Sequence, residues 1–249
     1  MPTYLYCLLT PAGGPGPAAT LRGIGGAAVR ALRTDSLEAW VSTVPAPTPA
    51  PTAEAAREHD VVVSAALGTG RTPLPARFGQ VWPSDDACLA AVEARADELR
   101  PLLARVAGLV EMTVYTLLPG MPPALRAPMP PPAEGRPGRA YLQRLRARAD
   151  RERHLRAALD ALRARVTQAL GSLSRGEVAE IRGGESALAL SVSYLVPRDA
   201  EATFRRVIEE VARESAARLV VAGPRAPYSF APAGRPVRRI RESRASDRS

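Results

Sequence analysis

The sequence predicts an α+β protein of two domains, each with a small mixed or antiparallel sheet covered by helices. Short apolar or alternating runs bounded by Gly and Pro alternate with longer runs of helical periodicity. A proline-rich stretch divides the 249 residues into two halves. We therefore expect an N-terminal α+β domain over 1–118, a linker over 119–137, a C-terminal α+β domain over 138–232 and a basic, disordered tail over 233–249.

The first half opens with predicted strands. Residues 3–10, TYLYCLLT, are rich in aromatic and branched side chains and indicate a buried strand. Residues 27–34 and 37–44 flank an Asp-Ser pair and predict a hairpin. The stretch 45–52, PAPTPAPT, is typical of an extended polyproline-like connector.

Two helices should follow, each with its own cap. Thr52 is a candidate N-cap for a helix that runs to about Leu67. Ser84 should cap a second helix that runs to Val106, in which Pro101 predicts a kink or an interruption. A strand over 109–118 closes this half. The expected buried face of the first helix comprises Ala55, His59, Val62, Val63 and Ala66.

The second half reads as helix, strand, strand, helix and strand, an order similar to ferredoxin-like domains. The strand at 188–196 alternates in the manner of a strand buried on one side. A helix containing Phe204, Val207 and Val211 and a strand at 218–223 complete it. The long first helix carries an apolar stripe of Leu142, Leu145, Ala149, Leu155, Leu159, Leu162, Val166 and Leu170, with Arg144, Arg146, Arg148, Arg151 and Arg153 on the remaining surface.

Charge leaves one alternative function open. All basic residues are Arg, and the formal net charge is +9, of which +4 falls in the tail. A basic nucleic-acid-binding protein is therefore the alternative reading. Interleaved acidic residues and the scarcity of aromatics, 4%, argue against it. The sequence lacks a signal-peptide pattern and a membrane-spanning apolar run, so we expect a cytoplasmic protein.

Motifs for catalysis, cofactors and metals are weak. Gly14, Gly16 and Ala19 fit a dinucleotide-binding spacing, but the intervening prolines remove amides that a pyrophosphate needs. His59 is expected to be a packing residue, and His154 lies among arginines. Two cysteines, Cys7 and Cys88, form no metal motif. We expect no catalytic, cofactor-binding or metal-binding residue, although an enzyme site between the two halves stays an alternative.

Residues 74–82, LPARFGQVW, allow two interpretations. They could form an active-site loop or a structural strand-to-turn element that leads into the helix at Ser84. We favour the second, in which Phe78 fills the N-terminal core and Gly79 permits a close backbone approach. Arg77 could also bind a partner, because a guanidinium can bridge carboxylates or carbonyl groups.

Several stretches occur in an order that resembles one known family. They are YLYCLL near the start, HDVV at 59–62, LPARFGQVW, PGRAYLQRLRAR at 137–148, SVSYLVPR at 191–198 and AGPRAPYSF at 222–230. Together they resemble the gas vesicle protein family GvpL/GvpF over nearly the whole chain. The matching positions are Pro75, Arg77, Phe78, Gly79, Gly138, Tyr141, Leu142, Tyr194, Leu195, Val196, Gly223, Pro224, Pro227, Tyr228 and Phe230.

The chain departs from the family pattern at two places. Arg225 and Ala226 stand where the family commonly has Trp and Pro, and Met112 and Thr113 follow Glu111 where it often has Trp-Gly. The resemblance implies a non-catalytic accessory protein in the assembly of gas vesicles. Gas vesicles are the compartments that give cells buoyancy. It implies contact with the small hydrophobic shell protein and other accessory proteins, without a cofactor, nucleic acid or membrane. Its motif residues are then structural or partner-binding.

Overall fold

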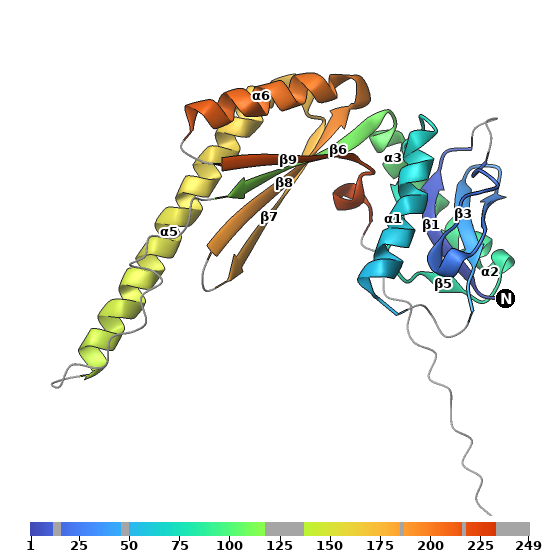
Figure 1. Ribbon diagram of the computed structural model, residues 1–249, viewed down its shortest axis with the longest axis horizontal. Helices are drawn as coiled ribbons and strands as arrows, with labels where there is room; N and C mark the ends of the chain where they lie inside the picture. The colour runs from blue at the N-terminus through green and yellow to red at the C-terminus, as the bar shows by residue number, and fades with distance from the viewer. Residues whose placement is uncertain (12–15, 46–49, 118–136, 185–186, 216–217, 233–249) are drawn as a thin grey trace, which may run out of the picture. The chain divides into compact units, whose positions relative to one another are not determined.

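The chain forms two compact units in a computed structural model that describes residues 1–11, 16–45, 50–117, 137–184, 187–215 and 218–232 (Figure 1). Of the described residues, the first unit comprises those of Met1–Arg105 with Ala231 and Pro232, and the second comprises those of Val106–Phe230. The predicted linker, apart from its last residue, and the tail lie outside the described residues, as does part of the 45–52 connector. Both sheets are antiparallel, so the predicted α+β class is confirmed.

The first sheet is built around a fully buried strand, β1 (Thr3–Leu9). Its order is β2-β3-β1-β4, with β5 also paired to β1. The predicted hairpin is present, since β2 and β3 pair antiparallel across Asp35 and Ser36. The other strands are β2 (Val29–Arg33), β3 (Glu38–Thr43), β4 (Leu74–Pro75) and β5 (Val81–Trp82), and a short 3-10 helix, η1 (Ile24–Gly26), precedes β2.

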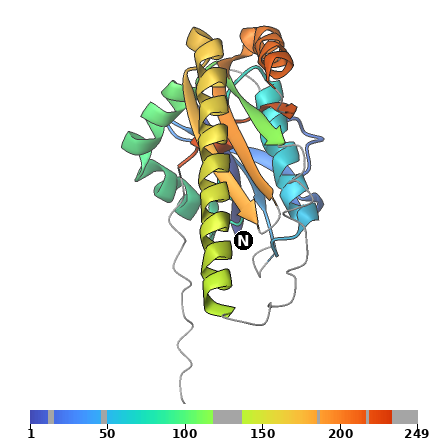
Figure 2. The same cartoon turned by 90° about the vertical axis from the view of Figure 1, so that its left-hand side faces the viewer.

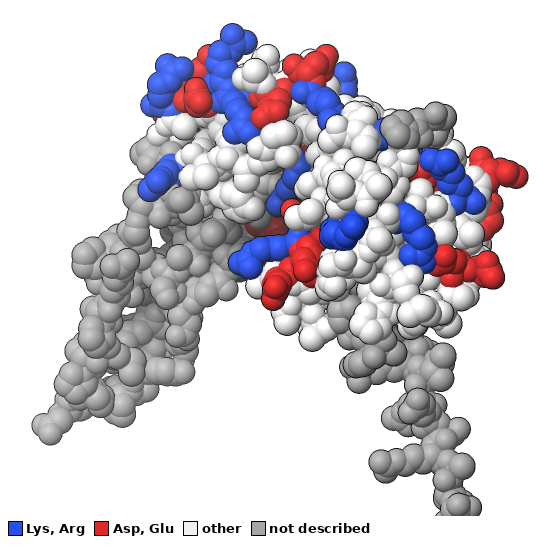
Figure 3. Space-filling model, turned by 45° about the vertical axis from the view of Figure 1, so that its right-hand side comes forward, with Lys and Arg blue, Asp and Glu red and all other residues white. Residues whose placement is uncertain are grey.

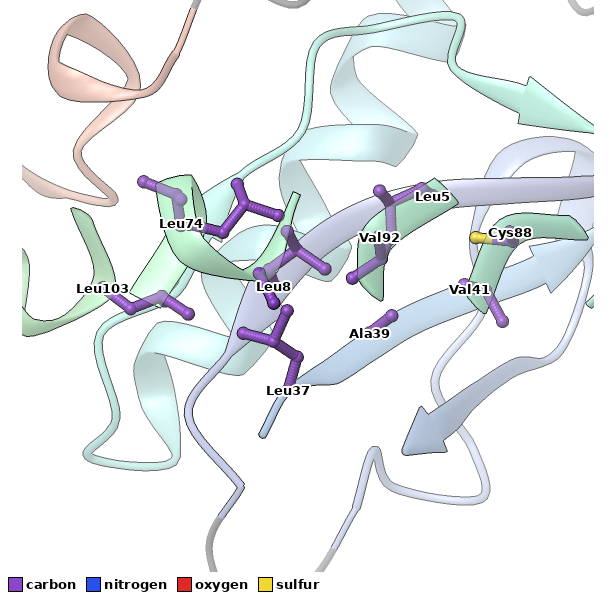
Figure 4. Close-up of a cluster of buried hydrophobic side chains, with 11 residues drawn as sticks. Leu5, Leu8, Leu37, Ala39, Val41, Leu74, Cys88, Val92 and Leu103 are labelled. Atoms are coloured by element: carbon purple, nitrogen blue, oxygen red, sulfur yellow. The ribbon is translucent and has the colours of Figure 1, made fainter. Parts of the chain in front are cut away.

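Helices cover both faces of this sheet. Helix α1 (Ala53–Gly68) begins at Thr52, whose side chain accepts a hydrogen bond from the Ala55 amide as predicted. All five residues of its predicted face are buried. On the opposite face, α2 (Asp85–Glu93) and α3 (Ala96–Val106) bury one apolar cluster against the strands (Figure 4). That cluster contains Leu5, Leu8, Leu37, Ala39, Val41, Leu74, Cys88, Val92, Ala96, Leu99 and Leu103.

We predicted one helix from Ser84 that is kinked or interrupted at Pro101, and the position of the interruption was wrong. The chain breaks at Ala94 and Arg95, and Pro101 lies inside α3. At the break, the Arg95 amide bonds to the Val92 carbonyl, a tightened turn that ends α2. A new helix therefore starts just ahead of the proline, which removes one donor within it.

The second unit has the element order β6-α5-β7-β8-α6-β9. Its sheet order is β7-β8-β6-β9, with every neighbouring pair antiparallel, which is ferredoxin-like. Strand β6 (Leu109–Leu117) is the first strand of this unit, whereas we assigned 109–118 to the N-terminal domain. The remaining elements are α5 (Pro137–Leu170), η2 (Gly171–Leu173), β7 (Gly176–Gly184), β8 (Ala187–Pro197), η3 (Arg198–Ala200), α6 (Glu201–Glu214), β9 (Arg218–Arg225) and η4 (Tyr228–Phe230).

Helices α5 and α6 cover one face of this sheet, and Figure 2 shows α5 running along the strands. The apolar stripe of α5 is buried at Leu159, Leu162, Val166 and Leu170. Leu142, near its start, is 55% exposed, so the predicted stripe is not buried along its whole length. Helix α5 extends beyond the end of the sheet on which it packs, because its 34 residues span about 50 Å.

Strand β8 also differs from its prediction. Tyr194 and Val196 are buried on the helix side as expected, but Ser193 and Leu195 are buried too. The second face is therefore covered at this end of the strand. The cover includes Ser229 of η4, whose hydroxyl bonds to the Ser193 hydroxyl at 3.1 Å.

Candidate interaction groove

The segment 74–82 is held against β1 along its length. Strands β4 and β5 both pair with β1, and the turn between them contains Phe78 and Gly79. The Gly79 amide donates to the Tyr4 hydroxyl at 3.0 Å. Gly79 has a φ of +85° and no heavy atom within 4 Å of a Cβ built there. Glycine is thus required by the positive φ and not, as we expected, by a close backbone approach.

A groove opens between this segment and helices α2 and α3. Its volume is about 90 Å³, and Leu5, Leu8, Leu74, Val92 and Leu99 form its apolar floor. Figure 4 shows several of these side chains in the cluster beneath it. Small-molecule sites usually measure about 300–1,000 Å³. This groove therefore suits one apolar side chain of a protein partner better than a cofactor.

The rim of the groove is polar and cationic. Arg77 is exposed there, beside Gln80, Trp82 and Arg95. Arg95 donates from Nε and Nη2 to the two carboxylate oxygens of Glu98, at 3.0 and 2.9 Å. These hydrogen bonds hold the pKa of the Glu98 carboxyl below its usual value. An apolar floor with an arginine-bearing rim matches the general composition of protein–protein contacts.

Behind the segment, four aromatic rings support the turn. Phe78 lies edge-on to Tyr4, with ring centroids 6.1 Å apart, and 6.0 Å from His59. Phe78 is only partly buried, so it closes the edge of the core that we expected it to fill. Tyr6 completes the group at 4.9 Å from Tyr4. The turn that carries Arg77 is therefore anchored on the interior of the first unit.

His59 is a buried packing residue in this group. Its Nδ1 lies 2.9 Å from the Tyr4 hydroxyl. The same hydroxyl accepts from the Gly79 amide, so it joins the imidazole to the turn. Burial lowers the pKa of His59 to about 4. The imidazole is thus neutral near pH 7.

A buried polar cluster around Glu111, which the sequence did not reveal, lies in the second unit. The Glu111 side chain is completely buried and accepts from Arg225 Nε and Nη2 at 3.1 and 2.6 Å. It also accepts from the Ser229 amide and hydroxyl, each at 2.8 Å. The Arg225 Nη2 reaches the Thr113 hydroxyl at 2.9 Å. With its oxygens occupied, Glu111 fastens the segment after β9 to the sheet.

The motif positions fall into both units. Pro75 and Arg77 line the groove, Phe78 and Gly79 form the turn that follows them, and the others lie in the second unit. Gly138 and Tyr141 begin α5, where the Tyr141 side chain is outside the described set. Tyr194 and Leu195 are buried in β8. Pro224, Pro227, Tyr228 and Phe230 follow Gly223, which has a φ of +115° and where a Cβ would lie 2.7 Å from the Glu111 carbonyl oxygen.

Charges of both signs are interleaved over the described surface. Figure 3 shows arginine and acidic side chains side by side on the face it draws. Arg30 pairs with Asp85 at 2.5 Å and Arg205 with Glu201 at 3.0 Å. No cluster of three or more His, Cys, Asp or Glu residues suited to a metal occurs among the described residues. Within the same residues, no helix is long and apolar enough to span a membrane.

The fold defines the class, an α+β protein of two units, and the first unit carries a small apolar groove with a polar rim. A family model described as gas vesicle synthesis protein GvpL/GvpF matches residues 2–232. Gas vesicle protein L of Streptomyces sp. (strain CB03234) is 34% identical over 250 residues, covering 92% of each chain. The chain belongs to the GvpL/GvpF family of gas vesicle synthesis proteins.

Solved structures share the fold. The crystal structure of GvpF from Anabaena sp. PCC7120 matches with a TM-score of 0.76 and 20% identity, covering 94% of this chain and 97% of that one. GvpF from Microcystis aeruginosa matches with a TM-score of 0.68 and 17% identity, covering 92% and 98%. The predicted resemblance is confirmed, and membership in this family supports a role in gas vesicle assembly.

Proposed function

We propose that this protein is a non-catalytic accessory protein that binds the small hydrophobic shell protein in the cytoplasm during gas vesicle formation. The observation that carries the proposal is the groove, with its floor of leucine and valine and its Arg77 and Arg95 rim. A shell subunit must expose apolar surface in order to assemble, and such surface aggregates unless it is covered. The groove would take one of its apolar side chains.

The rim gives the contact its reversibility and direction. An exposed arginine such as Arg77 can pair with a carboxylate of a partner at modest energetic gain, so it orients the contact without making it permanent. The basic surface of α5, with Arg146, Arg153 and Arg156 exposed, is a further candidate contact for the same partner. Other gas vesicle accessory proteins are the next partners we expect.

Co-expression with the shell protein tests the proposal. Ala91 lines the groove, so Ala91→Phe should fill it and abolish recovery of the shell protein in a pull-down. Ala90, its exposed neighbour on α2, is not among the lining residues and provides the matched control Ala90→Phe. Light scattering should show shell aggregation suppressed by the wild type and by Ala90→Phe only. Equal binding by both variants would exclude the groove, and no binding by the wild type would exclude the function.

The dependence of binding on salt concentration distinguishes the proposed function from the nucleic-acid-binding alternative. Binding through phosphates weakens steeply as ionic strength rises, because counterions are released. A contact built on an apolar groove should change little over the same range. The alternative would be favoured if the wild type bound nucleic acid with an affinity that falls steeply as salt rises and did not bind the shell protein.

A further inference from the structure

The described chain ends at the groove of the first unit. Ala231 packs against the apolar cluster beneath the floor, and Pro232, the last described residue, lines the groove itself. Residues 233–249 follow directly, and we call them the C-terminal tail. Because the tail is tethered at the groove, its effective concentration there is far above that of a separate molecule in dilute solution.

The C-terminal tail carries two large apolar side chains, Val237 and Ile240, among residues that are otherwise charged or small or are proline. Val237 is the fifth residue after Pro232, so at most about 18 Å of extended chain separates them. The groove measures about 90 Å³ and has a floor of leucine and valine. It therefore suits one branched aliphatic side chain of the tail, whose burial is favourable.

Charge favours the same occupant. The C-terminal tail has six arginines against two carboxylates, a net charge of +4. Helices α2 and α3, which form one wall of the groove, have five carboxylates against three arginines over residues 85–106, a net charge of −2. Although Arg77 stands on the rim, Arg95 is already paired with Glu98. Asp86 and Glu93 are exposed and pair with no base among the described residues, so this wall can attract a basic segment.

We propose that the C-terminal tail occupies the groove of its own chain through Val237 or Ile240 and is displaced by the shell protein. This inference concerns regulation of the groove and rests on the proposed function for its second step. The contact is maintained by the tether and not by a large buried area, so a partner with more contact area can replace the tail. Until then, the apolar floor stays covered and is unavailable for non-specific association.

Acrylamide quenching of tryptophan fluorescence tests the occupant in the full chain, without the shell protein. Trp82 lines the groove, whereas Trp40 is 1% exposed and is inaccessible to the quencher. Val237→Ser with Ile240→Ser keeps the length and charge of the tail and should make Trp82 more strongly quenched than in the wild type. Ala245→Ser, a polar substitution elsewhere in the tail, is the matched control and should be quenched like the wild type.

Binding of the shell protein tests the displacement. The double variant should bind it up to about tenfold more tightly than the wild type, because an occupied groove lowers the apparent affinity in proportion to the fraction that is open. Equal quenching of the wild type and the double variant, or equal measurable affinities for the shell protein, would overturn the inference. If the double variant is quenched more strongly but neither chain binds the shell protein, the tail occupies the groove and the proposed function is excluded instead.

Discussion

The Tyr4 hydroxyl and Nδ1 of His59 lie 2.9 Å apart in the interior of the first unit, which joins the central strand to helix α1. The same hydroxyl accepts the Gly79 amide, so one side chain connects sheet, helix and the turn beside the groove. Protonation of His59 would place a charge inside this buried group, and burial disfavours the charged form.

We predict that the stability of the first unit falls in mild acid because of His59. The pKa of this imidazole is about 4 in the folded chain, where burial disfavours the charged form, against about 6.5 when unfolded. Its contribution is complete above pH 6.5 and is lost as pH falls towards 4, by roughly 3 kcal/mol. Urea unfolding at several pH values measures it. His59→Gln, which cannot titrate, should lack this component, and an unchanged acid dependence in that variant would contradict the assignment.

Phe78→Ala should destabilise the first unit by about 2–3 kcal/mol. A fully buried Phe usually costs about 3–5 kcal/mol, and this ring is only partly buried against Tyr4 and His59. Thermal and urea unfolding provide the value, and exposed Val61→Ala should stay within about 0.5 kcal/mol of the wild type. Wild-type stability with loss of shell protein binding would instead make Phe78 a contact residue.

Local pattern predicted much of the first unit. Thr52 and Ser84 cap their helices as their positions before apolar periodicities indicate. The Asp-Ser hairpin and the buried face of α1 are also properties of short windows, where side-chain period and turn chemistry are sufficient. These features depend on neighbours within a few residues.

The remaining features depend on long-range pairing. Strand β6 joins the second sheet because β8 and β9 supply its partners, although the proline-rich stretch follows β6 directly. Glu111 and Arg225 are 114 positions apart, and their pairing has no local signal. The groove likewise needs β1, β4, α2 and α3 together. A single sequence carries no distance information between such positions.

We expect Arg225→Leu to destabilise the second unit by about 3–5 kcal/mol. The substitution leaves the buried Glu111 carboxylate without its cation, which is the costly way to break a buried ion pair. Arg225→Leu with Glu111→Gln should recover much of the loss, because no charge then remains buried and the Gln oxygen still accepts from the Ser229 amide. Chemical denaturation of all variants measures the coupling. If the losses of stability from the two substitutions simply add, residues 111 and 225 contribute to stability independently of each other.

Both thiols should be inert in the native protein. Cys7 and Cys88 are free and buried, and burial raises the pKa of Cys88 to about 12 and that of Cys7 even further. Since the thiolate is the reactive form, a thiol reagent should label the native chain only as fast as it unfolds. Absorbance with Ellman's reagent should show both thiols after denaturation. Rapid labelling before unfolding would contradict the packing of β1 and α2.

The most direct test of the central claim, that the groove holds the shell protein, is site-specific photo-crosslinking during gas vesicle formation. A photoreactive amino acid at Gln80 would sit in the groove lining, and one at exposed Val61 would sit on α1, outside that lining. We predict a crosslink to the shell protein from position 80 and none from position 61. Equal crosslinking from both positions, or none from position 80 while vesicles still form, would contradict the account.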